Sequence, residues 1–307
     1  MSETYDIIVI GGGIAGLTAG LTAARLGLRT RVLGGQVLGG QLLSIAEVDG
    51  FPGHPEGIPG FDLCPATEEA ATAAGAEVIA EDAEALARDG DGWIVTGESA
   101  TYRAKAVVLA TGSALKTLDV PGETRLTGKG VSHCASCDAP LLKGKEVVVI
   151  GGGDSALQEA LTLVPVVSRV TILTDGPGLT AQASYQERIR SAANVDVICG
   201  ARVLEIIGED GVTGVRYGAN GAEQTVPAAS AFIFVGLKPN AGLATGLGIV
   251  DDAGLVRVDH GMRTTAERLY AAGTVRSGAA FRAAASAGDG AAAAISADAD
   301  LNADDNR

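Results

Sequence analysis

Residues 5–33 read YDIIVIGGGIAGLTAGLTAARLGLRTRVL, an apolar run, a cluster of glycines, an amphipathic segment and a second apolar run. The run Ile7–Ile10 has no polar interruption, as is typical of a parallel strand that is buried on both faces. A strand, a tight turn, a helix and a strand in this order form a βαβ unit. The stretch therefore predicts a parallel sheet that is covered by helices.

The same order of segments occurs a second time. Residues 145–173 read KEVVVIGGGDSALQEALTLVPVVSRVTIL and repeat the first unit at an offset of 140 positions. Two further apolar runs, AVVLATG at 106–112 and AFIFVG at 231–236, end in small residues and precede a connection that contains a proline. They are interpreted as the exits from two dinucleotide domains. We expect an α/β fold with two Rossmann-like dinucleotide-binding domains, the second inserted into the first.

The expected domain boundaries follow from this order. A chain of 307 residues is long enough for two domains, each with its own core. The first domain is expected to be discontinuous, with residues 1–116 and 245–307, and the second to comprise residues 117–244. The acidic end of the chain, from Asp298 onward, is expected to fray.

Both units carry the dinucleotide fingerprint in its turn. The first glycine permits a tight turn, the second lets the backbone approach a pyrophosphate, and the third small residue lets helix and strand pack closely. The helix N-terminus then faces the phosphates. One glycine-rich turn can arise from packing alone, but two, each between a strand and a helix, indicate two dinucleotide sites. The positions are Gly11, Gly13 and Gly16 in the first unit, and Gly151, Gly153 and Ala156 in the second.

Composition and charge narrow the range of partners. Hydrophobic residues make up 47% and charged residues 20%, as in globular proteins, while the net charge of −14 opposes binding to nucleic acid or to an anionic membrane. The opening MSETYDIIVIGGG has no signal-peptide pattern, and no apolar run approaches the ~18 residues that span a bilayer. We expect a cytoplasmic protein that binds neither nucleic acid nor membrane.

The four cysteines separate into two isolated residues and one close pair. Cys64 and Cys199 are expected to be small buried hydrophobes. Cys134 and Cys137 form C-A-S-C, which can be half of a zinc site or a redox pair. Zinc needs four ligands, and the other cysteines and the histidines have no ligand spacing. The pair is therefore interpreted as redox-active, with Asp138 as the group that moves a proton when the disulfide opens.

Two dinucleotide motifs with C-x-x-C-D ahead of the second resemble the low-molecular-weight thioredoxin reductases. They also resemble the flavoprotein component of alkyl hydroperoxide reductase, whose extra N-terminal disulfide domain this chain has no room for. The resemblance covers nearly the whole chain. Its motifs are IIVIGGGIAGLTAG, GGQL at 39–42, FPG at 51–53, LATG, VSHCASCD, VVVIGGGDSALQEA, FVGLKPN and YAAGTVRSG.

The resemblance implies a flavoprotein that passes electrons from a nicotinamide through FAD to the disulfide of a thioredoxin-like or peroxiredoxin-linked protein. It implies that Cys137 faces the flavin, that Cys134 attacks the partner's disulfide, and that the protein is a homodimer. The residues expected at FAD are Gly11, Gly13, Gly16, Gly40, Gln41, Gly112, Gly273 and Thr274. Those expected at the nicotinamide are Gly151, Gly153, Asp154, Ser155 and Asp175.

The segment expected to hold the 2′-phosphate of NADPH departs from the family. Members specific for NADPH carry H-R-R-D-x-x-R-A, whereas residues 174–181 read TDGPGLTA, without a basic side chain. The Asp175 carboxylate would repel a phosphate but accept a hydrogen bond from a ribose hydroxyl. NADH is therefore favoured over NADPH. The alternative interpretation is that Asp175 is only a turn residue.

Two departures concern the flavin and leave other functions open. The family's Asp after A-A-G is Thr274 here, which loses one charge-assisted bond of about 1–3 kcal/mol. The family's R-Q-A is Arg282-Ala283-Ala284, without the amide. One alternative is a dithiol oxidase that uses O₂, and another is a reductase fed by a donor such as ferredoxin. A non-catalytic flavin-binding redox sensor is the third.

Overall fold

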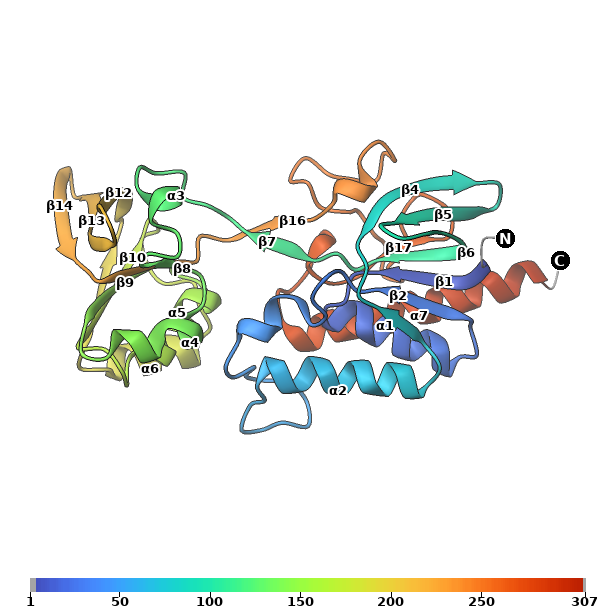
Figure 1. Ribbon diagram of the computed structural model, residues 1–307, viewed down its shortest axis with the longest axis horizontal. Helices are drawn as coiled ribbons and strands as arrows, with labels where there is room; N and C mark the ends of the chain where they lie inside the picture. The colour runs from blue at the N-terminus through green and yellow to red at the C-terminus, as the bar shows by residue number, and fades with distance from the viewer. Residues whose placement is uncertain (1–3, 306–307) are drawn as a thin grey trace. The chain divides into compact units, whose positions relative to one another are not determined.

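The computed structural model of the protein describes residues 4–305 and divides them between two compact units. Unit 1 comprises Met1–Ala114 and Lys238–Arg307, and unit 2 comprises Leu115–Leu237. The two chain crossings run through β7 (Ser113–Leu115) and β16 (Leu237–Pro239), which pair with each other. The expected α/β class with two Rossmann-type units is confirmed (Figure 1).

Unit 1 is built on one large sheet. Its strand order is β3-β2-β1-β6-β5-β4, with β17 also paired to β6. The pairs of β1, β2, β3 and β17 are parallel, and β4 and β5 are antiparallel additions. The strands are β1 (Thr4–Ile10), β2 (Thr30–Leu33), β3 (Glu77–Ile79), β4 (Ala83–Asp89), β5 (Gly92–Gly97), β6 (Thr101–Leu109) and β17 (Leu269–Ala271).

Two alanine-rich helices cover one face of this sheet (Figure 1). They are α1 (Ile14–Arg25) and α7 (Ala283–Asp305), while α2 (Gly60–Ala73) packs beside α1. Helices can approach closely where side chains are small, and a Cβ on Gly290 of α7 would stand only 2.0 Å from the Ala15 carbonyl oxygen. The opposite face packs against the loop that contains Ile249 and Val256.

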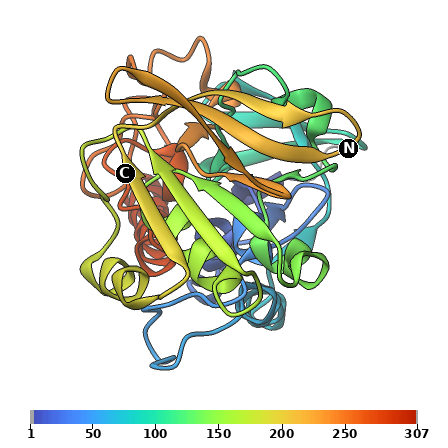
Figure 2. The ribbon, with the colours of Figure 1, turned by 90° about the vertical axis from the view of Figure 1, so that its left-hand side faces the viewer.

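Unit 2 contains a parallel sheet with order β11-β10-β9-β15-β8 and a separate antiparallel sheet β12-β13-β14 (Figure 2). Strand residues alternate between the two faces: Val147 and Val149 pack toward the helices, whereas Val148 and Ile150 pack toward the antiparallel sheet. The strands are β8 (Val131–Ser132), β9 (Glu146–Ile150), β10 (Arg169–Thr174), β11 (Val195–Cys199), β12 (Arg202–Gly208), β13 (Val212–Ala219), β14 (Ala222–Pro227) and β15 (Ser230–Ile233). The helices are α3 (Glu123–Leu126), α4 (Ala135–Asp138), α5 (Asp154–Leu163) and α6 (Ala183–Ser191).

Two expectations about single segments need correction. The chain does not fray at Asp298, because α7 continues to Asp305. Cys64 is buried as expected, but Cys199 is exposed. The reason is its position, since Cys199 is the last residue of the edge strand β11, where only one neighbouring strand covers the backbone.

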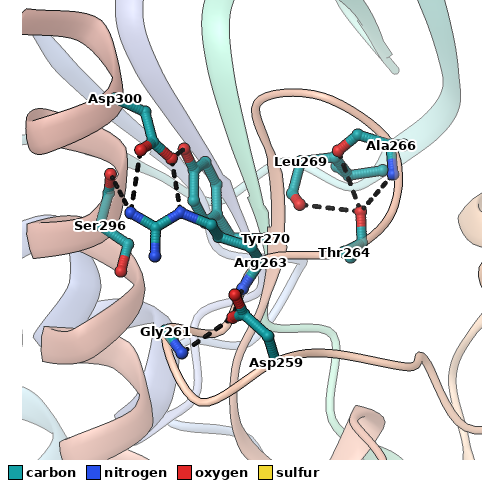
Figure 3. A network of polar contacts seen from close by, with 9 residues as sticks. All are labelled: Asp259, Gly261, Arg263, Thr264, Ala266, Leu269, Tyr270, Ser296 and Asp300. Carbon is teal, nitrogen blue, oxygen red and sulfur yellow. Dashed lines mark hydrogen bonds and ion pairs between the residues drawn. The ribbon is translucent and has the colours of Figure 1, made fainter. Parts of the chain in front are cut away.

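A polar network holds the end of α7 to the sheet (Figure 3). The Arg263 guanidinium donates to both carboxylate oxygens of Asp300, at 2.7 and 2.9 Å. The Tyr270 hydroxyl donates to the same carboxylate at 2.7 Å. Asp259 fixes the preceding turn by accepting the amides of Gly261 and Arg263, each at 2.8 Å. This network explains why the acidic end of the chain stays helical.

Asp300→Asn is expected to lower the free energy of unfolding by about 1 kcal/mol at neutral pH, because solvent screens the partly exposed pair with Arg263. The hydrogen bond from Arg263 holds the pKa of Asp300 below its usual value of 3.8. The stabilisation is therefore present above that value and is lost as the pH falls through the lower, folded-state pKa. Urea unfolding of the apoprotein, followed by the fluorescence of the single tryptophan Trp93, measures the difference.

Asp298→Asn is the matched control, because the bond that Asp298 accepts from Asn302 in the same helix, at 3.0 Å, is exposed to solvent. We expect this variant to unfold like the unmodified chain at every pH. Equal loss in the two variants at neutral pH would contradict the role given to the Asp300 network.

Candidate active site

The glycine turn of unit 1 has one open position between two crowded ones. A Cβ on Gly11, where φ is +121°, would stand 2.2 Å from the Ala110 carbonyl oxygen, and one on Gly16 would stand 1.8 Å from the Gly11 oxygen. A Cβ on Gly13 would meet nothing within 4 Å. No side chain caps α1 and no acid lies in its first turn. The turn therefore leaves room for a pyrophosphate at a helix N-terminus that favours anions.

The other residues predicted at FAD lie around this turn. Gly40 stands close to Gly13, with 3.5 Å between its Cβ position and the Gly13 Cα. The Gln41 amide donates to the Ser113 carbonyl oxygen. The Ser113 hydroxyl in turn donates to the Thr274 carbonyl oxygen at 3.0 Å and lies 3.1 Å from the Thr274 hydroxyl.

The predicted glycines 112 and 273 complete the same group. A Cβ on Gly112 would stand 3.6 Å from the Thr274 hydroxyl, and one on Gly273 would stand 2.9 Å from the Ala15 Cβ, in the first turn of α1. Unit 1 thus brings all eight residues predicted at FAD to the carboxyl ends of its parallel strands, where dinucleotides bind in such sheets.

Two charged residues at this group were missed by the sequence reasoning. The Asp289 carboxylate accepts the Gly273 amide at 3.2 Å and both an Nε and an Nη2 bond from Arg276, each at 2.7 Å. This pair is almost buried and joins α7 to the turn that carries Thr274. A separation of 13 residues hides it in the sequence.

A carboxylate is also absent where the fingerprint leads one to expect it. An acid near the end of the second strand usually binds the adenosine ribose, but the residues after β2 are Gly34 and Gly35. Their amides donate to the Ile79 and Glu81 carbonyl oxygens, at 2.9 and 3.0 Å. This pairing brings Asp82 to the end of β2, with its Oδ1 3.0 Å from the Cβ position of Gly35.

Cys134 and Cys137 of unit 2 are joined in a disulfide, with 5.4 Å between their Cα atoms. Cys134 caps α4, and its Sγ accepts the Cys137 amide at 3.3 Å. The Ser136 hydroxyl lies 3.4 Å from the same sulfur. Cys137 is exposed and Asp138, the last residue of α4, is partly exposed. The arrangement suits reversible opening of a disulfide, with a carboxyl group next in sequence.

A second carboxyl group lies behind the disulfide and was not singled out in the sequence. Glu159 of α5 is only 3% exposed, and its carboxylate accepts the amide of Ala135 at 2.7 Å. Burial raises the pKa of Glu159 to about 7, against the smaller lowering effect of that hydrogen bond.

The glycine turn of unit 2 repeats the crowding of the first. A Cβ on Gly151 would stand 2.2 Å from the Phe234 carbonyl oxygen, whereas the nearest atom to one on Gly153 is the Thr180 hydroxyl, at 3.9 Å. Gly153 therefore leaves space for a second pyrophosphate. Ser155 is exposed in the first turn of α5.

The acids predicted at the nicotinamide differ in their surroundings. The Asp154 carboxylate accepts the Gln182 amide at 2.7 Å, so it closes the loop that follows β10. Asp175 is exposed directly after β10, at the carboxyl end of the sheet. Gly176 accepts the Gly200 amide at 2.9 Å, which joins this loop to the end of β11.

Residues 4–305 lack the features of a metal site and of a membrane-spanning helix. That part of the chain contains no group of three or more His, Cys, Asp or Glu side chains that could hold a metal ion. Within the same residues, every helix is too short or too polar to cross a bilayer.

Comparison with known proteins gives consistent results. The sequence pattern of the pyridine nucleotide-disulphide oxidoreductases matches residues 5–291. The thioredoxin reductase of Listeria monocytogenes is 38% identical over 291 residues, which cover 94% of this chain and 91% of that protein. The bifunctional thioredoxin reductase/thioredoxin of Mycobacterium leprae is 37% identical over 96% of this chain and 65% of its own length. The crystal structure of Lactococcus lactis thioredoxin reductase superposes with a TM-score of 0.94 at 34% identity, covering 97% of this chain and 99% of that one.

Adding a methyl group is expected to have different effects at the open glycine, Gly13, and at the crowded glycine, Gly16. Gly13→Ala is expected to leave the stability of the apoprotein unchanged and to weaken FAD binding at least tenfold, because its methyl group enters the space left for the pyrophosphate. Gly16→Ala is expected to destabilise the apoprotein, because its methyl group meets the Gly11 oxygen. Thermal unfolding of the apoprotein and fluorescence titration with FAD measure the two effects.

Gly153→Ala is the matched control in the second turn, and we expect it to leave FAD affinity unchanged. Weaker FAD binding in this variant, or unchanged FAD binding in Gly13→Ala, would contradict the assignment of the first turn to FAD.

Proposed function

Because the chain belongs to the pyridine nucleotide-disulphide oxidoreductase family and is an enzyme of the thioredoxin reductase type, we propose that it is an NADH-linked reductase of a thioredoxin-like disulfide. NADH and FAD, when bound, would supply the electrons that reduce the Cys134–Cys137 disulfide, and the reduced cysteines would pass them to the disulfide of the partner. The single observation that carries this proposal is the disulfide of unit 2, which stands ahead of an intact dinucleotide turn.

Unit 1 has the residues to hold FAD. When bound, FAD supplies two-electron transfer between a nicotinamide and a disulfide. The open face at Gly13 would receive its pyrophosphate, and the Gly112–Thr274 group at the ends of β6 and β17 would help to hold the cofactor. Asp289 and Arg276 hold the Gly273 turn in place. The neutral Thr274 hydroxyl takes the place of a carboxylate and offers a weaker acceptor to the cofactor.

The disulfide supplies the exchange chemistry. Reduction breaks the S–S bond, and the Cys134 thiolate then attacks a sulfur of the partner's disulfide to form a mixed disulfide. Attack by Cys137 on Cys134 releases the reduced partner and restores the disulfide of the enzyme. Asp138 transfers the proton that the leaving sulfur requires.

Asp175 favours NADH over NADPH. It is the exposed carboxylate after β10, the second strand of the nucleotide-binding βαβ unit, where an acid accepts a ribose hydroxyl. The loop at 174–181 has no basic side chain to neutralise a 2′-phosphate. A phosphate beside this carboxylate is repelled, and because Asp175 is exposed, solvent and salt weaken that repulsion.

The partner is proposed from the chemistry of the relatives. The name of the Mycobacterium leprae relative joins a thioredoxin reductase to a thioredoxin, so a small dithiol protein is the class of substrate that fits. A peroxiredoxin-linked disulfide protein belongs to the same class. We also propose a homodimer, on the resemblance alone, and sedimentation of the holoprotein tests it.

Mixing the flavin-loaded protein anaerobically with each nicotinamide is expected to bleach the flavin rapidly with NADH and at least tenfold more slowly with NADPH. Asp175→Asn is expected to narrow this difference, because it removes the charge that repels the 2′-phosphate. Stopped-flow absorbance measures both rates. Asp210→Asn, an exposed acid in the turn between β12 and β13, is the control and keeps the original preference.

Faster bleaching by NADPH would contradict the role of Asp175 and leave the disulfide reductase intact. If neither nicotinamide bleaches the flavin but a small dithiol does, and air restores the colour, the protein is a dithiol oxidase.

Cys134→Ser and Cys137→Ser are each expected to abolish reduction of thioredoxin while the flavin is still bleached by the nicotinamide. Retained turnover with thioredoxin would contradict the role of the pair.

A further inference from the structure

Glu159 is a buried carboxyl group in direct contact with the redox-active turn. Its carboxylate accepts the amide of Ala135, at 2.7 Å, and both residues are almost fully buried. Ala135 begins α4, so its amide is one of the donors that a helix cannot satisfy within itself. A buried amide without an acceptor costs about 1–3 kcal/mol, so Glu159 holds the turn that carries Cys134 and Cys137.

The same hydrogen bond brings the carboxyl group close to the Cys134 sulfur. The amide nitrogen of Ala135 is bonded to the carbonyl carbon of Cys134. By standard backbone dimensions, the carboxylate therefore lies roughly 4–7 Å from the Cys134 sulfur. Two negative charges at this distance, with one of them buried, disfavour each other strongly. Ionisation of Glu159 therefore makes the thiolate form of Cys134 less favourable, and the thiolate makes ionisation of Glu159 less favourable.

We propose that Glu159 positions the disulfide turn through Ala135 and takes up a proton when the disulfide is reduced, so that the Cys134 thiolate and the carboxylate are not negative together. The proposal rests on the reductase function proposed above. The disulfide accepts two electrons from its donor and its S–S bond breaks. One proton goes to the Cys137 sulfur and the other to Glu159, which leaves Cys134 as the thiolate.

Hydrogen-bond donors near the Cys134 sulfur suit it to keep the negative charge. The Cys134 sulfur already accepts the amide of Cys137 at 3.3 Å and lies 3.4 Å from the Ser136 hydroxyl. Burial raises the pKa of Glu159 to about 7, so the carboxyl group can exchange its proton near neutral pH. A group that stayed ionised or protonated near neutral pH would not couple to the disulfide.

The elements packed against α5 carry other ionisable groups. They are Asp138 and the cysteines at α4, His133 ahead of it, and Tyr185, whose ring is buried in the same cluster on α6. His133 is held through its Nδ1 to the Ile233 carbonyl oxygen at 2.9 Å. On α5 itself, Asp154 is bound to Gln182. The exposed charged residues of the packed elements are Glu146 on β9, Arg169 on β10, and Glu187, Arg188 and Arg190 on α6.

The test measures the reactivity of Cys134 against pH in a Cys137→Ser background, where its thiol is free. Iodoacetamide alkylation of the full-length protein is followed by peptide mass analysis, and the exposed Cys199 is the internal reference. Adding Glu159→Gln, which keeps an acceptor for Ala135 but removes the charge, is expected to speed alkylation of Cys134 roughly two- to tenfold at pH 8. At pH 6 the two proteins are expected to react alike, because the carboxyl group is then protonated.

Glu187→Gln is the matched control, since it removes an exposed charge from α6 of the same unit, and its profile is expected to follow that of the parent protein. Superimposable profiles for Glu159→Gln and its parent would overturn the proposal. An equal change at pH 6 and pH 8 would also overturn it, because a purely structural effect does not follow the ionisation of a carboxyl group.

A second measurement uses the unmodified chain and does not depend on the variants folding. Infrared difference spectra are recorded near pH 7.5 as a small dithiol reduces the flavin-free protein. They are expected to show a gain in the band of a protonated carboxyl group. Spectra without that gain would overturn the proposal. Neither experiment uses a nicotinamide or thioredoxin, so both stand apart from the tests of the proposed function.

Discussion

The rest of the structure depends on the close contact of backbone with backbone at the two glycine turns. At Gly16 and at Gly151 a single methyl group would stand 1.8 and 2.2 Å from a carbonyl oxygen, so helix and strand can approach only if these positions stay bare. The approach aligns each helix N-terminus with the carboxyl ends of its strands. The residues predicted to bind the cofactors lie at that edge of each sheet, since the loops that leave parallel strands there meet one another.

Features formed by neighbouring residues could be predicted from the sequence. Contacts between residues that are distant along the chain could not. The glycine turns, the strands beside them and the C-x-x-C pair are patterns of neighbouring residues, and each was found. The contact of Asp289 with Arg276 and that of Glu159 with Ala135 span 13 and 24 positions, and no periodicity marks them. Cys199 was misjudged because burial depends on whether a strand lies at an edge, which the order of strands in space decides.

The end of the chain was misjudged for a related reason. An acidic, polar stretch has no internal reason to stay helical, and an isolated helix of that composition would be marginal. The stretch is ordered because Arg263, which precedes β17, and Tyr270, which lies in β17, present a cation and a hydroxyl to Asp300 (Figure 3). A carboxylate that reads as solvated surface in the sequence is in the structure the anchor of α7.

The two carboxyl groups near the disulfide differ in their exposure to solvent, and we assign them different roles in proton transfer. Asp138 is partly exposed and can exchange protons with solvent, whereas Glu159 is buried beside an amide that fixes its distance from Cys134. In a buried site a charge is costly unless a partner or a proton offsets it. Opening the disulfide creates a new negative charge on the Cys134 sulfur. The proton that Glu159 takes up offsets this charge, because the carboxyl group is then neutral. Asp138, which is partly exposed, serves the leaving sulfur instead, because a group that reaches solvent can return its proton there.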